Sequence, residues 1–258
     1  MKQITLLDGT VESQEKLINK MYDDEFYYGK LNTQALSSSS IKLLVDSPKK
    51  YYYVNKYGGQ ETQGLRDGRL LHTLILEPEK FEQFNFVDVK SKNTKAYKLA
   101  KEELGEVYTQ KEKSDAERLA DALLRNSKAI DLLNNSQFEQ PYIDHINGYA
   151  FRGKADILHK GGGICDIKTT TDIKAFKYSA NKYGYDIQCY IYCQLFGVNY
   201  FDFKFLVLDK SSLDIGVFEC SEEFYLRGKE KTEIGIKRYE EYFIKNTDLD
   251  NYFITDIL

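Results

Sequence analysis

The sequence predicts an α/β fold, because three strand-like segments follow one another between stretches of helical periodicity. The strands lie within residues 142–170, where Asn147-Gly148 is a strong hairpin signal and Gly161-Gly162-Gly163 marks a second turn. Apolar residues recur at helical spacing on both sides of this region, in 64–76 and in 186–196. At 258 residues, the chain can bury a core in one large domain or two small ones.

The composition narrows the classes of function. A formal net charge of −4 gives no overall positive field, so any contact with phosphate must come from a local basic patch. No apolar run approaches the roughly 20 residues that span a bilayer, and we expect no membrane association. Four cysteines without a signal peptide are typical of reduced thiols in a cytoplasmic protein: Cys165, Cys189, Cys193 and Cys220.

The first 34 residues carry weak signals, and we expect a short helix near 11–22 followed by a loop. Serines before Ile41 then predict the start of a helix, and Ser47-Pro48 predicts its end. The serines have two interpretations. They cap the helix, or their hydroxyls and the free N–H groups at this helix end hold a phosphate, which nominates Ser38 and Ser39.

A further helix is predicted over 64–76, with Glu77-Pro78 stopping it. Its residues Gly68, His72 and Leu76 share one face, because they are four positions apart. A lone histidine on such a face is more often a core residue than a ligand. Beside a carboxylate site, His72 becomes a candidate metal ligand or phosphate contact.

The next region is rich in charge. Lysines within 89–101 form either a solvated helix face or a surface that follows phosphates. Residues 111–133 predict two helices with a break near Asn126-Ser127. Just before the strands, Glu139 either reaches the site as a third carboxylate or lies exposed at a strand end.

The strands themselves suggest a site. Alternation along 149–158 places Asp156 on the same face as Lys154, and Asp166 shares a face with Lys168. If the second hairpin is centred on Gly161, Asp156 lies opposite Asp166, with Cβ atoms about 4.5–5.5 Å apart. Facing carboxylates are tolerated when they share a proton or a cation, and hard oxygen donors suit Mg²⁺. The alternative is a surface hairpin with an ordinary Asp/Lys ion pair.

Downstream of the strands, residues 169–185 are polar. The helix predicted over 186–196 places Gln188 and Tyr192 on one face. Buried strands are predicted over 200–208 and 215–220, and a long amphipathic helix over 222–245.

Four motifs occur in order: Gly68-x-x-x-His72, Gly153-x-x-Asp156, Asp166-Ile167-Lys168 and Gln188-x-x-x-Tyr192. In this order and spacing they resemble the RecB-like branch of the PD-(D/E)xK nucleases, and most closely the phage and prophage exodeoxyribonuclease VIII (RecE-type) nuclease domain. Many relatives have Glu in place of Asp166. The resemblance implies an N-terminal extension (1–34), an exonuclease domain (35–245) and a C-terminal tail (246–258).

The resemblance implies a restriction-endonuclease-like core of order αβββαβ, with a central mixed sheet flanked by helices. It also implies that Asp156, Asp166 and the carbonyl of Ile167 bind Mg²⁺, with Mn²⁺ as a substitute, and that His72 and Glu139 complete the site. Lys168 would orient or help deprotonate the attacking water. The pair Gln188 and Tyr192 would position Lys168 and the scissile phosphate.

The implied activity is Mg²⁺-dependent 5′→3′ digestion of double-stranded DNA ends, which leaves a 3′ single strand for recombination by a RecT-type annealing protein. Relatives form rings, which implies a homo-oligomer (a trimer or tetramer) in the cytoplasm of a bacterial host. We expect DNA contacts from Ser38, Ser39, Arg69 and Lys154. Two rivals remain: a Cas4-like nuclease with an iron–sulfur cluster on the cysteines, and a catalytically silent DNA-end-binding protein.

Overall fold

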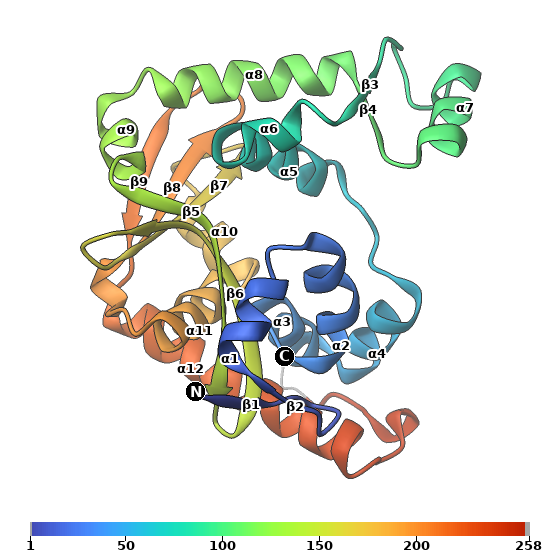
Figure 1. Cartoon of the computed structure of the whole chain (residues 1–258), viewed down its shortest axis with the longest axis vertical. Coiled ribbons are helices and arrows are strands. Elements are labelled where there is room, and N and C mark those ends of the chain that lie inside the picture. Colours follow the sequence, from blue (N-terminus) through green and yellow to red (C-terminus); the bar gives the residue numbers. More distant parts are fainter. Residues whose placement is uncertain (1, 256–258) are drawn as a thin grey trace.

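The computed structural model describes residues 2–255, and its centre is a five-stranded mixed sheet of order β5-β6-β7-β8-β9 (Figure 1). The strands span Ser136–Ile146, Tyr149–His159, Ile164–Thr170, Phe203–Asp209 and Ile215–Glu219. Only β7 and β8 run parallel, and the other neighbours are antiparallel. The predicted αβββαβ order is present as α5-β5-β6-β7-α11-β8, so the predicted fold class is confirmed.

Helices cover both faces of this sheet. On one face lie α3 (Ser38–Asp46), α11 (Tyr185–Phe196) and α12 (Glu222–Tyr239); on the other lie α5 (Gln63–Leu76), α8 (Gln110–Leu124) and α9 (Ser127–Leu133). The strand β8 shows why both faces must be covered, because Phe205 and Val207 enter the first core while Leu206 and Leu208 enter the second. A strand buried on both sides reads as an apolar run, as β8 does.

Most of the predicted helix boundaries are close to those observed. Ser37 caps α3 by accepting from the Ser40 N–H, and Ser47 caps α4 (Pro48–Tyr57), so Ser47-Pro48 both ends one helix and begins the next. The predicted break near Asn126 separates α8 from α9. Helix α7 (Lys95–Leu104) begins later than the lysine run suggested. A π-helical turn, Glu240–Ile244, follows α12.

Two predicted boundaries are wrong. The helix expected near 11–22 is present as α1 (Gln14–Lys20), but a short strand, β2 (Val11–Ser13), occupies the start of that range. The strand expected from position 200 begins at Phe203, because a 3₁₀ turn precedes it. The polar stretch 169–185, for which no element was predicted, contains the helix α10 (Phe176–Lys182).

The N-terminal segment packs on the hairpin of β5 and β6. Strands β1 (Gln3–Thr5) and β2 pair antiparallel, and α2 (Leu31–Gln34) follows a π-helical turn, Phe26–Lys30. Buried residues of this segment share one core cluster with Ile143 and Ala150 of the hairpin. Whether residues 1–34, 35–245 and 246–258 behave as separate units stays a prediction, and positions 1 and 256–258 lie outside the described residues.

Residues 78–109, which follow α5, form a small subdomain at the side of the central sheet. It contains α6 (Pro78–Phe81) and a parallel pair, β3 (Asn85–Val87) with β4 (Val107–Thr109), and α7 projects from it at one edge of the molecule (Figure 1). Among the described residues, no helix has the length and apolar character needed to cross a bilayer.

Candidate active site

Asp156 lies where β6 and β7 separate. These strands pair through only two residue pairs, one of which joins Ile157 to Cys165. Continued by one step, this register places Asp156 opposite Asp166, as a hairpin centred on Gly161 requires. Instead of a further ladder bond, the Ile167 N–H donates to Asp156 Oδ2 at 2.8 Å. The strands therefore part around the Asp156 carboxylate.

Glu139 lies opposite Asp156 on the other side. Pairing of β5 with β6 continues on both sides of this position, for example from Gln140 to Ala155, but is interrupted at Glu139 itself. Its φ is +49°, in the left-handed region, which costs a residue with a side chain about 1–2 kcal/mol. Strain of this kind gathers at functional sites. Three neighbouring strands thus each contribute one carboxylate.

His72 on α5 completes a cluster with two of these acids. Its Nδ1 lies 3.4 Å from Asp156 Oδ2, and its Nε2 lies 2.7 Å from the carbonyl oxygen of Ile167. One ligand atom from each of His72, Glu139 and Asp156 lies within 4.8 Å of the other two. Glu139 therefore lies beside Asp156, and its role as a metal ligand stays a prediction.

The acids of this cluster repel one another. Burial, and then the charge of Asp166, raises the pKa of Asp156 to about 6, although His72 and Lys168 oppose the rise. Burial, and then the charge of Asp156, raises the pKa of Glu139 to about 8. Carboxylates held this close are stabilised in their charged form by a cation. Two carboxylates and one imidazole suit Mn²⁺, and they suit Mg²⁺ when water supplies the remaining ligands.

Asp166 is held from two sides. Gln188 Nε2 donates to Oδ1, and the ammonium of Lys168 forms an ion pair with Oδ2. Asp166 is only 1% exposed, so the Lys168 ammonium offsets the charge on Oδ2 in place of water. Asp166 adjoins the cluster of three ligands without being one of its members.

Helix α11 approaches β6 closely at this point. Tyr192 Oη donates to the Lys154 carbonyl at 3.0 Å, and a Cβ on Gly153 would lie 3.0 Å from both Tyr192 and Leu195. Glycine at 153 therefore allows the helix to sit where Gln188 reaches Asp166. The observed partner of Gln188 is Asp166, whereas the sequence analysis expected Gln188 and Tyr192 to position Lys168.

The residues expected to contact DNA are spread out. Ser38 is buried in the first turn of α3, while Ser39 is exposed. Arg69 is half-exposed and forms ion pairs with two glutamates. Lys154 is 7% exposed, and its ammonium forms an ion pair with Asp24 at 2.8 Å. Their roles stay predictions, but Arg69 and Lys154 already have acidic partners.

Two residues near Lys168 escaped the sequence analysis. Lys168 Nζ lies 5.0 Å from the centroid of the Tyr185 ring, and Lys42 Nζ of α3 lies 5.2 Å from the same centroid. No sequence pattern links position 42 to a strand more than 120 residues away. Only the packing of α3 against α11 brings Lys42 to the site.

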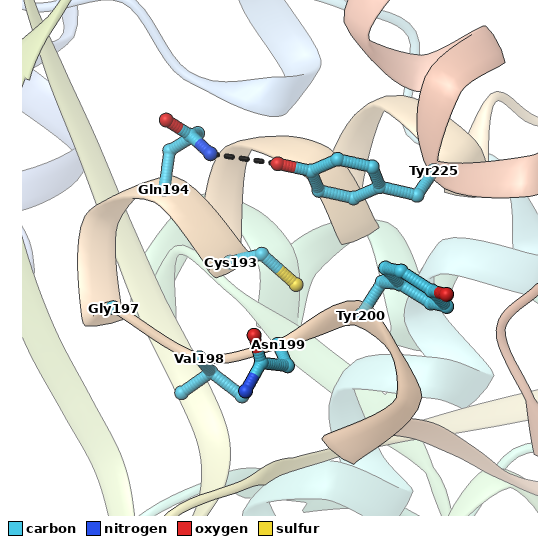
Figure 2. A pocket seen from close by; sticks show the side chains of 7 residues that line it. All are labelled: Cys193, Gln194, Gly197, Val198, Asn199, Tyr200 and Tyr225. Atoms are coloured by element: carbon cyan, nitrogen blue, oxygen red, sulfur yellow. Dashed lines mark hydrogen bonds between the residues drawn. The ribbon is translucent and has the colours of Figure 1, made fainter. Parts of the chain in front are cut away.

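The four cysteines are divided between the two faces of the sheet. Cys165 packs among residues of α5, α8 and α9, whereas Cys189, Cys193 and Cys220 belong to the other core cluster. Cys193 also lines a pocket of about 420 Å³ at the end of α11, which holds none of the candidate ligands (Figure 2). The division does not suit a cluster held by all four thiolates.

Comparisons with known proteins identify the family and the fold of this chain. A family model described as "PDDEXK-like domain of unknown function (DUF3799)" matches residues 37–248. No curated protein matches the sequence. The chain resembles a crystal structure named "Putative exonuclease" from Eubacterium rectale, with 15% identity, a TM-score of 0.67, and coverage of 92% of this chain and 95% of the other.

A phage-related exonuclease from Haemophilus somnus 129PT is also 15% identical, over 84% of this chain and 99% of the other, with a TM-score of 0.37. At such identities, only the first of these structural similarities supports the fold. The family match covers most of the chain and includes Asp156, Asp166 and Lys168. The chain therefore belongs to the family described as the PDDEXK-like domain DUF3799, and the predicted PD-(D/E)xK superfamily is confirmed.

Proposed function

We propose that this protein is a divalent-metal-dependent exonuclease that hydrolyses phosphodiester bonds at the ends of double-stranded DNA. The observation that carries the proposal is the meeting of His72, Glu139 and Asp156 within 4.8 Å, beside the ion pair of Asp166 and Lys168. Paired acids with an adjacent lysine are what phosphodiester hydrolysis requires, since negative charge grows on oxygens that are already negative.

In this proposal the metal is Mg²⁺, with Mn²⁺ as a substitute. Asp156, Glu139 and His72 would hold it, and Asp166 Oδ2 would be the adjoining oxygen donor. When bound, the ion offsets charge on the phosphate and lowers the pKa of a bound water. His72 is already oriented for this role, because its Nε2 is fixed at the Ile167 carbonyl and its Nδ1 faces Asp156.

Lys168 supplies a fixed positive charge. Burial disfavours its charged form, but Asp166 and then Asp156 outweigh that penalty and raise the pKa of Lys168 above its usual value. A lysine held in this way orients the attacking water and steadies charge on the phosphorus oxygens. It is poorly suited to accept a proton, so of the two roles implied by the resemblance we favour orientation.

The finer features of the proposal come from the resemblance to exodeoxyribonuclease VIII. They are 5′→3′ polarity, a 3′ single-stranded product for a RecT-type annealing protein, a ring of three or four subunits, and action in the bacterial cytoplasm. The name of the similar structure from Eubacterium rectale, "Putative exonuclease", supports the choice of exonuclease over endonuclease.

One experiment tests activity, end requirement, polarity and metal together. Linear duplex labelled at either the 5′ or the 3′ end is incubated beside closed circular DNA of the same sequence, with Mg²⁺ or with EDTA. We expect loss of linear DNA only, early release of the 5′ label, and no loss in EDTA. Digestion that survives saturating EDTA would refute the metal role, and binding without digestion would favour the catalytically silent DNA-end-binding protein.

A further inference from the structure

Lys42 and Lys168 place two positive charges against one aromatic ring. Their ammonium nitrogens lie 5.2 and 5.0 Å from the centroid of Tyr185. Lys168 has Asp166 as its counterion. Among the described residues, the ammonium of Lys42 forms neither an ion pair nor a hydrogen bond, and it contacts the ring of Tyr185. The two lysines therefore share a single counterion, the carboxylate of Asp166.

The charge of Lys168 acts on the proton affinity of Lys42. Burial, and then the charge of Lys168, lowers the pKa of Lys42 to about 8, although Asp166 and Asp186 oppose the fall. Two cations held close together are stabilised by a shared anion, just as the neighbouring carboxylates are stabilised by a cation. The site therefore has one region that favours a metal ion and one that favours an anion.

The position of Lys42 is fixed by packing. Its aliphatic stem rests on Gly184, where φ is +63° and a Cβ would come within 3.2 Å of Lys42 Cγ. Lys42 is half-buried on α3, a helix that packs against both α11 and α12. A side chain confined in this way loses little freedom when it binds a ligand.

We propose that Lys42 and Tyr185 form an anion seat, in which Lys42 binds a backbone phosphate of the DNA strand being cut, within one nucleotide of the scissile bond. The inference rests on the proposed function. Lys42 is a positioning residue here: it places the strand, while Lys168 faces the reacting phosphate. Both ammonium groups lie against the ring of Tyr185, whose π electrons attract positive charge.

The test compares Lys42→Met, which keeps the stem and removes the charge, with Lys42→Arg, which keeps the charge. The exposed Lys229 of α12, which forms no ion pair in the described part of the chain, gives the matched control Lys229→Met. Binding of a fluorescent linear duplex is measured in Ca²⁺, and KM and kcat are measured in Mg²⁺. Circular dichroism and thermal melting verify the fold of each variant.

We expect Lys42→Met to raise Kd and KM about 10- to 100-fold, with a smaller effect on kcat, because one charge-assisted contact is lost. Lys42→Arg should recover most of the affinity. The slope of log K against log salt should fall by about one in Lys42→Met, as expected for one phosphate contact. A structural role alone would not change this slope.

A neutral methylphosphonate, introduced at one linkage at a time, locates the contact. At the contacted linkage it should weaken wild-type binding but have no further effect on Lys42→Met. Equal sensitivity of both proteins at every linkage, or wild-type affinity in a folded Lys42→Met, overturns the seat. Wild-type protein that binds DNA through Lys42 without digesting it would sink the proposed function and leave the seat standing.

Discussion

Glu139 lies opposite Asp156 on the neighbouring antiparallel strand, in a left-handed backbone conformation that turns its carboxyl group toward the same point. Burial and the charge of Asp156 raise the pKa of Glu139 to about 8, and burial and the charge of Asp166 raise the pKa of Asp156 to about 6. The two carboxylates and the strained backbone at Glu139 are locally unfavourable, and a bound cation would stabilise the charged form of both acids.

The first prediction concerns the chemistry. Replacing Asp166 by Asn, or Lys168 by Met, should reduce the rate of DNA digestion at least about 100-fold, because each removes a charge next to the reacting phosphate. The measurement is digestion of linear duplex in Mg²⁺, with circular dichroism as a check of fold. Asp131→Ala, at an exposed acid of α9, should digest DNA normally. Activity within a few-fold of wild type in either site variant would contradict the assignment.

The second prediction concerns pH and stability without metal. The folded pKa values of Glu139 and Asp156 lie above their usual values of 4.5 and 3.8, so the folded state binds more protons than the unfolded state at intermediate pH. These groups therefore make the free energy of unfolding fall as pH rises from about 4 to about 8.

Mg²⁺ should reverse the effect, so its stabilisation in thermal melts should be larger at pH 8 than at pH 5. The control is Glu139→Gln, in which the pH dependence should become weaker. The prediction would be contradicted if, in EDTA, the unfolding midpoint of the wild type rose from about pH 4 to about pH 8 while that of Glu139→Gln did not.

The third prediction separates backbone strain from charge at position 139. Glu139→Gly removes both the carboxylate and the left-handed strain, and it should be more stable than Glu139→Gln by about 1 kcal/mol in denaturant unfolding. Both variants should bind Mg²⁺ more weakly than wild type, as measured by calorimetry. If the glutamine variant proved the more stable of the two, strain at this residue would have been overestimated.

The fourth prediction concerns the approach of α11 to β6. Gly153→Ala inserts a Cβ 3.0 Å from Tyr192 and Leu195, so it should destabilise the fold by about 1–3 kcal/mol and move Gln188 away from Asp166. Digestion should slow as a result. Gly64→Ala is the matched control, because its nearest neighbour would be 3.9 Å away. Equal stability of the two variants would argue that α11 yields easily.

The central acids and the histidine of the site could be predicted from the sequence, because local patterns determine their positions. The glycine turn at Gly161 sets the register that brings Asp156 opposite Asp166. The four-residue spacing places Gly68, His72 and Leu76 on one face of α5, and His72 on that face contacts Asp156. Short strands such as β1 and β3 were missed, since three residues are too few for a periodic pattern to be recognised.

The remaining parts of the site depend on tertiary packing. The left-handed turn at Glu139 has no glycine or asparagine to signal it. Lys42 reaches Tyr185 only because α3 packs on α11, and Lys154 meets Asp24 only because the N-terminal segment folds onto the hairpin. Contacts between distant segments leave no mark in the spacing of residues along the chain.

The short ladder between β6 and β7 has one more consequence. The pairing of β6 with β7 ends at Ile157, so part of the edge of β6 is left without β7 as a partner. Leu36, just before α3, pairs with this edge: its N–H donates to the Ala150 carbonyl, and its carbonyl accepts from the Arg152 N–H. If β6 and β7 paired along their whole length, the N–H and carbonyl of Ile167 would form hydrogen bonds within the sheet. Because the strands separate, the Ile167 N–H donates to Asp156 and the Ile167 carbonyl contacts His72, so a substitution that lengthened the ladder would remove both contacts from the candidate metal site.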